Sequence, residues 1–392
     1  MEVLRNLQQQ LAKFLQHNLN LNRFVLRYQN KQLAESGDIL IKQNEFQNFN
    51  EEELATLVSV SKEWEISVKT AQLTSTASIS LFLSRDRVYR AFIQKCTESG
   101  FAGTARDKQI LLICDIDENQ NNLSMVDFRI LSVKNVASNL LRFDGYKVSK
   151  EFNDGVQTMS ITRNRSKQST DSYEILCGSV ATCGITADEY IRKRANDMQL
   201  IAQHKYGIRV KDHRRFQNTI ISLGRSAAIV DMLEAKASSP IDIRKNNNQS
   251  SKGAQFVLYN YARLSVLFKT FEEKQKTNYY PQLPLIIDID FKLLKEEDEW
   301  QLFWVYVAGF PTMINQALGD GQLSRLAPHV VLSFTSSLVI CLSKYYRRIR
   351  ILTENRQHLL PTMFARIYLL QTVYNVLSTL LQLLNLEPVT EM

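Results

Sequence analysis

Tyrosine and arginine residues gather in the last third of the chain in a combination that suits contact with single-stranded RNA. Tyr345 and Tyr346 stand directly before Arg347 and Arg348, and Arg350 follows two positions later. Aromatic rings stack on unpaired bases, and guanidinium groups contact the backbone phosphates. Successive side chains on a helix point about 100° apart, so this run cannot present every member on one face. We expect one tyrosine to pack inward and the arginines to fan outward. Core packing and base stacking stay equally open for each tyrosine.

A second pair of the same kind lies earlier in the chain. Tyr259 and Arg263 are four positions apart, so on a helix they share a face. They form a further candidate contact with RNA. Arg263 can equally brace a helix end or pair with an acidic residue.

A basic run between residues 192 and 215 offers a different kind of RNA contact. Eight lysines and arginines stand there against two acids, Asp197 and Asp212. Such a run is either a solvated helix face or a strip that neutralises backbone phosphates, which makes binding salt-dependent. The candidate residues are Arg192, Lys193, Arg194, Lys205, Arg209, Lys211, Arg214 and Arg215.

Motifs for catalysis are missing from the sequence. It contains no GxGxG turn, no GxxxxGK[ST] loop, no GxSxG elbow and no HExxH helix. Asp115, Asp117 and Glu118 follow a strand-like run and are either metal ligands or, more simply, a solvated strand end. Cys177 and Cys183 match no common zinc spacing. We therefore assign no catalytic residue, no metal site and no cofactor.

Two regions of different character must position these residues. Residues 1–180 mix short strands, such as 65–73, 77–83 and 108–117, with helical stretches, and predict a mixed α/β domain. Residues 181–237 predict a basic helical connector, whose first helix begins with a capping box of Thr186 and Glu189. A polar, asparagine-rich stretch over 238–253 predicts a boundary. Apolar residues at three- and four-residue steps over 253–392 predict an all-α bundle, so the fold class is α+β.

Charge and composition narrow the class of partner. The 392 residues carry a formal net charge of +8, which favours a polyanionic partner. The five cysteines include no CxxC pair and are expected to be free thiols in a reducing compartment. The most apolar run is broken by Gly309 and Pro311, and the N-terminus lacks a signal-peptide core. We expect a cytoplasmic protein without a membrane partner.

The order of the last helices resembles the DALR anticodon-binding domain of arginyl-tRNA synthetases. The first helix has the Tyr-x-x-Ala-Arg pattern, a later one starts with Pro-His and holds the tyrosine pair, and the chain ends on a methionine. The matching positions are Tyr259, Ala262, Arg263, Pro328, His329, Tyr345, Tyr346, Arg350, Ile351, Leu352, Ala365, Arg366 and Met392. The resemblance implies that these helices hold an anticodon arm, and it adds Arg366 and Met392 to the candidate contacts.

Two further stretches narrow the resemblance to relatives that are not synthetases. YYPQLPLIIDIDFKLLKEEDEWQLF and ADEYIRKRANDMQLIAQHKYG look like those of animal DALR anticodon-binding domain-containing proteins, so the resemblance covers about residues 186–392. It implies a protein that binds arginine tRNA and partners a tRNA 3-methylcytidine methyltransferase.

The resemblance also exposes what the chain lacks as a synthetase. None of its five histidines lies in a His-x-Gly-His turn, and MVDFRILSVKN stands where that turn is expected. The letters YKVSK, residues 146–150, mimic a KMSKS loop by chance, too early in the chain. We expect a degenerate nucleotide-binding half and no enzyme. The alternatives are a protein–protein scaffold with a vestigial bundle and a residual synthetase, which would exchange pyrophosphate in the presence of arginine.

Overall fold

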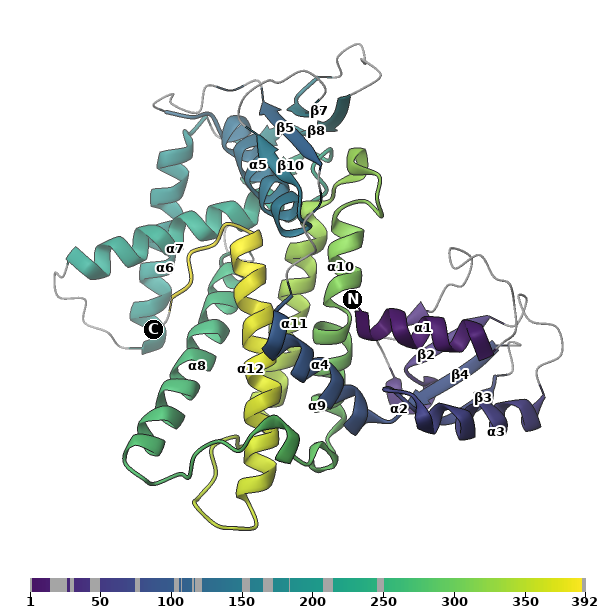
Figure 1. Ribbon diagram of the computed structural model, residues 1–392. Helices are drawn as coiled ribbons and strands as arrows, with labels where there is room; N and C mark the ends of the chain where they lie inside the picture. The colour runs from purple at the N-terminus through teal and green to yellow at the C-terminus, as the bar shows by residue number, and fades with distance from the viewer. Residues whose placement is uncertain are drawn as a thin grey trace. The chain divides into compact units, whose positions relative to one another are not determined.

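A computed structural model describes most of the chain, and Figure 1 shows how its elements are arranged. The described residues are 2–14, 27–28, 32–42, 50–74, 78–101, 106, 108–114, 116, 122–149, 156–164, 172–182, 184–206, 214–244 and 250–389. The chain divides into two units, each assembled from three stretches. The first unit comprises Met1–Phe101, Thr270–Pro311 and Cys341–Val373, and the second comprises Ala102–Lys269, Thr312–Ile340 and Tyr374–Met392.

The first unit contains an antiparallel sheet in the strand order β1-β2-β4-β3. Its inner strand β4 is almost wholly buried and carries Ile79, Leu81 and Leu83 on one face of the sheet. Leu4, Leu7 and Leu11 of the first helix are three and four positions apart, so they share one face, and all three are buried. The elements are α1 (Glu2–Phe14), β1 (Arg27–Tyr28), α2 (Leu33–Ser36), β2 (Ile39–Lys42), α3 (Glu51–Val60), η2 (Ser61–Glu63), β3 (Val68–Leu73), β4 (Ser78–Leu83) and α4 (Arg85–Ser99).

An aromatic core joins α4 to the helices that follow residue 280 in the same unit. The ring of Tyr89 lies 4.6 Å from that of Phe303 and 5.4 Å from that of Trp300. Such pairs add to the free energy gained by burying their surface. Arg85 closes the core from outside with a bidentate pair to Glu297 at 2.6 and 2.9 Å. The elements here are η3 (Ile286–Asp288), η4 (Phe291–Leu293), α9 (Glu297–Phe303) and the π-helical stretch η5 (Trp304–Ala308).

The second unit contains a parallel sheet in the order β6-β5-β7-β8, with one helix, α5, between β5 and β6. The sheet is apolar at Ile110, Leu112, Met159 and Ile161, all buried, as expected for a parallel sheet covered by helices. A short parallel pair, β9 with β10, lies in the same unit. The elements are β5 (Gln109–Cys114), α5 (Met125–Phe143), β6 (Lys147–Ser149), β7 (Gln157–Thr162), β8 (Ser172–Leu176), β9 (Val180–Ala181) and β10 (Ile241–Asp242).

Arg129 of α5 is fully buried and ties this helix to the chain segments that precede β9 and β10. Its guanidinium donates to the backbone carbonyls of Gly178, Met232 and Lys236 at 3.0–3.3 Å. Burial lowers the pKa of Arg129. A buried guanidinium is tolerated only when its donors are satisfied. The hydrogen bonds to these carbonyls therefore hold the two segments in place around Arg129.

Helices dominate the remainder of the chain. The prediction of an α-helical C-terminal region is confirmed, and Pro328 begins a helix, where a missing N–H is tolerated. The bounds are α6 (Ala187–Tyr206), α7 (Arg214–Leu233), α8 (Ser250–Lys276), α10 (Phe310–Ala317), η6 (Leu323–Arg325), α11 (Pro328–Arg348) and α12 (Leu360–Leu383).

The structure confirms the predicted fold class and corrects the predicted boundary. Helix α5 begins at Met125, because Ser124 caps it. The polar stretch 238–253 contains β10 and the start of α8. Asp115, Asp117 and Glu118 lie outside the described residues, and the division into three consecutive domains stays a prediction. In the described part of the chain, no helix is long and apolar enough to cross a membrane.

Candidate nucleic-acid interface

A group of cations lies at the C-terminal end of α11 in the first unit. Lys344, Arg347 and Arg348 occupy one face of the helix, since they are three and four positions apart. Arg350 follows the helix end, where its Nε donates to the carbonyl of Leu352 at 3.2 Å. We call these four residues the α11 cationic end. Cations are favoured at this end of a helix because the last carbonyls leave a partial negative charge.

The α11 cationic end keeps most of its charge accessible. The ammonium of Lys344 and the guanidinium of Arg348 share the carboxylate of Asp298 at 3.1 and 2.5 Å, yet both side chains are more than half exposed. Arg347 is exposed and its Nε donates to the carbonyl of Ser343. Two of the four cations share one carboxylate and the other two donate to backbone carbonyls, so the group keeps a net positive charge. Guanidinium groups bind phosphate oxygens in pairs. Lys344 was missed by the sequence analysis, although it lies one turn before Arg348.

Tyr345 faces the opposite way and is a correction to the candidate set. Its ring is fully buried and its hydroxyl donates to Glu299 at 3.0 Å. Burial and the nearby charge of Glu299 raise the pKa of Tyr345. Arg366 donates to the same carboxylate at 2.8 Å with its side chain 16% exposed, so it acts first as the counter-charge of a buried acid. One tyrosine therefore packs inward as predicted, and its neighbour Tyr346 is half-buried.

An exposed aromatic ring that the sequence analysis missed lies near the α11 cationic end. Tyr279 is 43% exposed, and the Lys274 ammonium is 4.9 Å from the centre of its ring. The neighbouring Tyr280 is buried and donates its hydroxyl to the carbonyl of Thr353. Burial raises the pKa of Tyr280 and the nearby charge of Arg350 partly offsets this. A ring with cations beside it is the arrangement on which an unpaired base can stack.

The earlier tyrosine–arginine pair lies in the second unit. Tyr259 and Arg263 are half-buried on α8, and both interact with neighbouring groups. Tyr261 is buried: its ring stacks on that of Tyr374 at 4.7 Å, and the two hydroxyls are 2.8 Å apart. Tyr261 therefore packs inside the unit, whereas Tyr259 and Arg263 stay candidate contacts.

The basic run 192–215 gives a mixed result. Arg192 and Lys193 are exposed on α6. Arg194 is a correction: it is buried, with its Nε 2.9 Å from Asp231 of α7, and Tyr190 donates to the same carboxylate at 2.6 Å. It braces two helices and cannot reach RNA. The side chains of Lys205, Arg209, Lys211, Arg214, Arg215 and Met392 lie outside what the structure describes.

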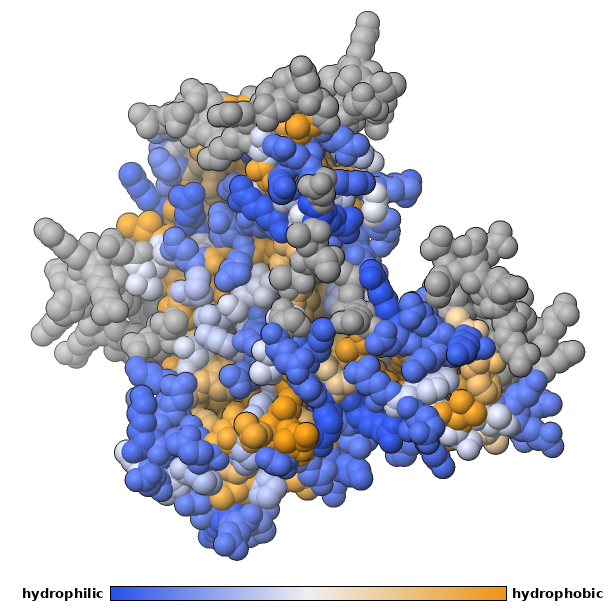
Figure 2. Space-filling view, viewed as in Figure 1, coloured by the Kyte–Doolittle hydropathy of each residue, from blue (hydrophilic) through white to orange (hydrophobic). Residues whose placement is uncertain are grey.

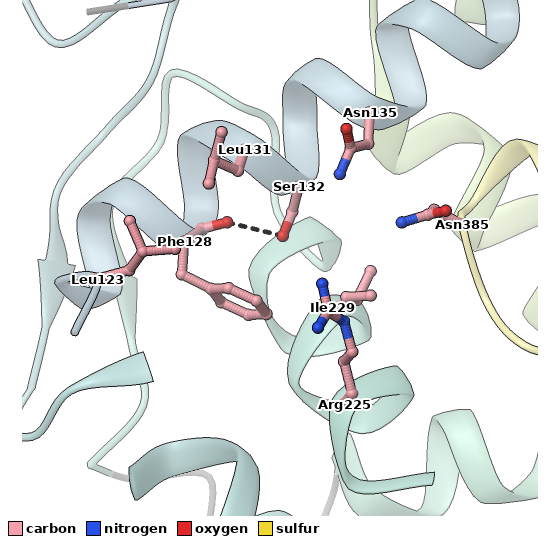
Figure 3. A pocket seen from close by; sticks show the side chains of 8 residues that line it. All are labelled: Leu123, Phe128, Leu131, Ser132, Asn135, Arg225, Ile229 and Asn385. Carbon is pink, nitrogen blue, oxygen red and sulfur yellow. Dashed lines mark hydrogen bonds between the residues drawn. The ribbon is translucent and has the colours of Figure 1, made fainter. Parts of the chain in front are cut away.

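The second unit contains a small pocket, drawn in Figure 3. Its volume is about 140 Å³. Small-molecule sites are usually about 300–1,000 Å³, so a nucleotide does not fit. The hydroxyl of Ser132 donates a hydrogen bond to the backbone carbonyl of Phe128 and is therefore not placed to act as a nucleophile. The lining residues are Leu123, Phe128, Leu131, Ser132, Asn135, Arg225, Ile229 and Asn385, which include no acid, histidine or cysteine.

The start of α5 lies where a nucleotide-binding sheet usually holds phosphate. Ligands of parallel sheets bind beyond the strand ends where the order reverses, here beside β5 and β7, with phosphate at a helix N-terminus. In this chain the first turn of α5 carries Asp127, which accepts from the Ser124 hydroxyl and pairs with Arg163, just after β7. A carboxylate thus occupies the position that would favour an anion. No cluster of metal ligands occurs within the described ranges.

Comparison with known proteins agrees with this geometry. Residues 257–392 match the family model of the DALR anticodon binding domain, a range that includes the α11 cationic end. A Danio rerio protein named DALR anticodon-binding domain-containing protein 3 is 32% identical over 232 residues, which cover 56% of this chain and 41% of that protein. Its Rattus norvegicus counterpart is 30% identical over 227 residues, covering 55% of this chain and 42% of that protein.

The solved structure of an arginyl-tRNA synthetase from Thermus thermophilus has a TM-score of 0.69 with this chain, at 10% sequence identity, and covers 99% of this chain and 100% of that one. The chain therefore has an arginyl-tRNA synthetase-like fold with a DALR domain at its C-terminal end, and the predicted resemblance is confirmed. The matched stretches span less than half the length of the two vertebrate relatives. Those relatives are named for the domain and not as synthetases.

Proposed function

We propose that this chain is a non-catalytic adaptor that binds arginine tRNAs through the anticodon arm. It supports formation of 3-methylcytidine in the anticodon loop by a partner methyltransferase. The observation that carries the proposal is the exposed α11 cationic end inside the stretch that matches an anticodon-binding domain. The arginine preference and the methyltransferase come from the resemblance to the animal proteins.

The proposed contacts follow from exposure and charge. Arg347 and Arg350, whose side chains are exposed, bind backbone phosphates of the anticodon arm. The ring of Tyr279 takes an unpaired base, a stacking contact that contributes roughly 1–3 kcal/mol per base. Arg192 and Lys193 of the second unit contact flanking backbone. Each phosphate contact makes binding more sensitive to salt, because counterions are released.

The proposed lack of catalysis is supported by the start of α5. An aminoacylating enzyme of this fold needs that region free to receive ATP phosphates, whereas here Asp127 is held there by Ser124 and Arg163. A carboxylate in the first turn repels phosphate at the distance where the helix would otherwise attract it.

The test is the double variant Arg347→Ala, Arg350→Ala in tRNA-binding measurements on the full chain. Loss of two phosphate contacts should weaken arginine-tRNA binding roughly tenfold or more and reduce the slope of log K against log salt by about 2. The matched control is Arg244→Ala, which removes an exposed arginine paired with Asp242 outside the matched domain and should bind like the wild type. Unchanged affinity and salt slope in the double variant would refute the assignment of the α11 cationic end.

A further readout separates tRNA holding from the adaptor role. Methylation of the anticodon loop by the partner enzyme should fall with the tRNA affinity of the double variant. If tRNA binding falls and methylation does not, the chain binds tRNA but does not serve the methyltransferase.

A further inference from the structure

The turn after α8 exposes apolar side chains to an unusual degree. Leu285 and Ile287 are 72% and 73% exposed, more than any other large apolar residue that the structure describes. They flank the first residue of η3, in the first unit. Figure 2 shows an orange patch bordered by blue over the segment between α8 and α9. Single exposed apolar residues are ordinary, whereas adjoining ones bordered by polar residues are typical of interaction sites.

The backbone of this turn is held from beneath by side chains of two helices. The guanidinium of Arg90, on α4, donates to the carbonyls of Ile286, Ile287 and Ile289 at 3.2, 2.9 and 2.8 Å. The hydroxyl of Tyr368, on α12, donates to the carbonyl of Pro284 at 2.8 Å. These hydrogen bonds fix the backbone of the turn in a conformation that leaves the side chains of Leu285 and Ile287 exposed.

This arrangement prepares the turn for binding. The guanidinium of Arg90 also lies 5.7 Å from the centre of the Phe291 ring. Phe291 is buried and anchors the segment in the core of the unit. Pro281 and Pro284 restrict the chain just before the turn. A partner therefore gains the burial of Leu285 and Ile287 without having to order the loop.

The chemistry of the turn selects a protein as its occupant. Leucine and isoleucine have no π-face for a base, and the exposed carboxylates of Asp288 and Asp290 beside them repel phosphates. The same two charges disfavour an anionic membrane surface. They also disfavour a symmetric contact with a second copy of the chain, because a two-fold interface would place each acid near its own copy.

We propose that the Leu285–Ile287 turn is a docking site for a separate protein that offers an apolar cleft with basic side chains at its rim. Leu285 and Ile287 enter the cleft, and Asp288 and Asp290 meet the rim. This contact is separate from the proposed tRNA contacts and stands or falls without them.

The test places a photo-crosslinking amino acid at position 285 of the full chain in cells, and at Ile340, another exposed apolar position, as the control. The expected result is a crosslink from 285 to one protein, at a peptide that combines apolar residues with lysine or arginine, and none to it from 340. Crosslinks to RNA, to a second copy of this chain, or to nothing beyond the control would each overturn the proposal.

The partner is then purified and its affinity measured. Each apolar side chain removed from the interface should weaken binding roughly tenfold, so L285S with I287S should weaken it about 100-fold. D288K with D290K should weaken it as well, because these charges would then repel the basic rim, whereas I340S should have no effect. Equal affinity for wild type and L285S/I287S would refute the docking site.

Binding of arginine tRNA by the L285S/I287S variant should stay at the wild-type level. This readout distinguishes the two proposals, since the Arg347→Ala, Arg350→Ala variant changes tRNA binding and leaves the partner contact in place.

Discussion

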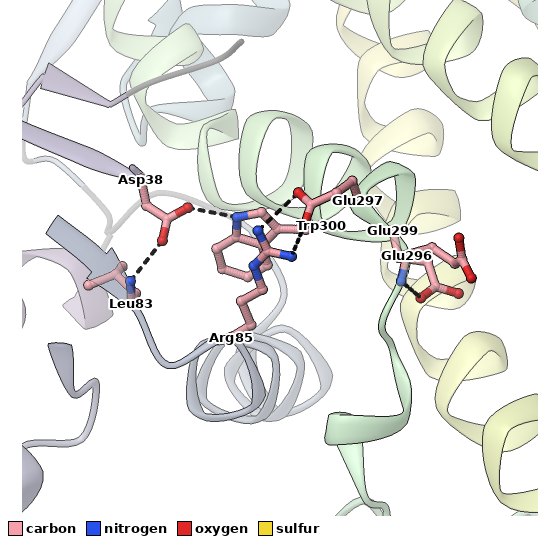
Figure 4. Close-up of polar contacts among 7 residues, drawn as sticks. All are labelled: Asp38, Leu83, Arg85, Glu296, Glu297, Glu299 and Trp300. Carbon is pink, nitrogen blue, oxygen red and sulfur yellow. Dashed lines mark hydrogen bonds and ion pairs between the residues drawn. The ribbon is translucent and has the colours of Figure 1, made fainter. Parts of the chain in front are cut away.

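Asp38 of the first unit has a buried carboxyl group, and Figure 4 shows its hydrogen bonds to Leu83 and Trp300. Its two oxygens accept from the backbone N–H of Leu83 at 2.8 Å and from the indole N–H of Trp300 at 2.7 Å. Desolvation nevertheless outweighs these bonds and raises its pKa from 3.8 to about 6. The residue thus joins the N-terminal sheet to α9 and ionises at a free-energy cost.

This cost predicts a pH dependence of stability. Between about pH 4 and pH 6 the folded chain holds a proton on Asp38 that the unfolded chain has released, so the free energy of unfolding falls as pH rises. The shift in pKa corresponds to a loss on the order of 3 kcal/mol from Asp38 by pH 7. Thermal unfolding of the wild type and of Asp38→Asn from pH 4 to 7 measures this contribution, because other groups cancel in the difference. The wild type should lose stability relative to the variant as pH rises; parallel curves would contradict the burial of Asp38.

Residue types were easier to predict than residue orientations. The run from Tyr345 to Arg350 was identified as aromatic and basic, and the inward packing of one tyrosine was expected from helical geometry. Which tyrosine turns inward is decided by Glu299, 46 positions earlier in the chain, which no local pattern reveals. The prediction that Arg194 contacts RNA is wrong for the same reason, because its partner Asp231 lies on the next helix.

At the scale of elements, the α6–α7 pair combines one feature that the sequence revealed with one that it concealed. The capping box is confirmed: the N–H of Thr186 donates to Glu189 at 2.8 Å, and that of Glu189 donates back to Thr186 at 3.3 Å. The close approach of the two helices at Gly224 was not predicted. A Cβ atom there would lie 2.6 Å from the backbone nitrogen of Ala195, far inside contact distance.

Gly224→Ala should therefore destabilise the second unit. Forcing a methyl group against a backbone costs typically 1–3 kcal/mol, since the helices must separate and lose packing around them. Gly253→Ala is the matched control, because its Cβ would meet only the Val230 side chain at 3.7 Å. Alanine is favoured over glycine in a helix by up to about 1 kcal/mol, so the control should be as stable as the wild type or more so. Equal unfolding midpoints for the two variants would show that the helices do not cross at Gly224.

For the whole molecule, hydrophobic periodicity predicted the α+β class because long helical stretches carry the strongest signal. The parallel order β6-β5-β7-β8 depends on pairings between distant strands, and short apolar runs do not encode their neighbours. The exposed turn at Leu285 and Ile287 was hidden for a related reason: apolar letters predict burial unless the packing around them is known.

The salt dependence of tRNA binding distinguishes the adaptor from the vestigial scaffold. If about five phosphates are contacted, a threefold rise in salt should weaken binding about 100-fold for any tRNA, since counterion release is independent of sequence. Contacts to bases release no counterions, so an adaptor should keep its preference for arginine tRNA over a leucine tRNA of matched purity at both salts. The measurement is the ratio of the two dissociation constants at 100 and 300 mM KCl. A ratio near one at both concentrations means that a basic surface binds RNA without distinguishing its sequence, as expected for the scaffold. A ratio well above one that survives the higher salt requires base recognition, and charge alone cannot supply that.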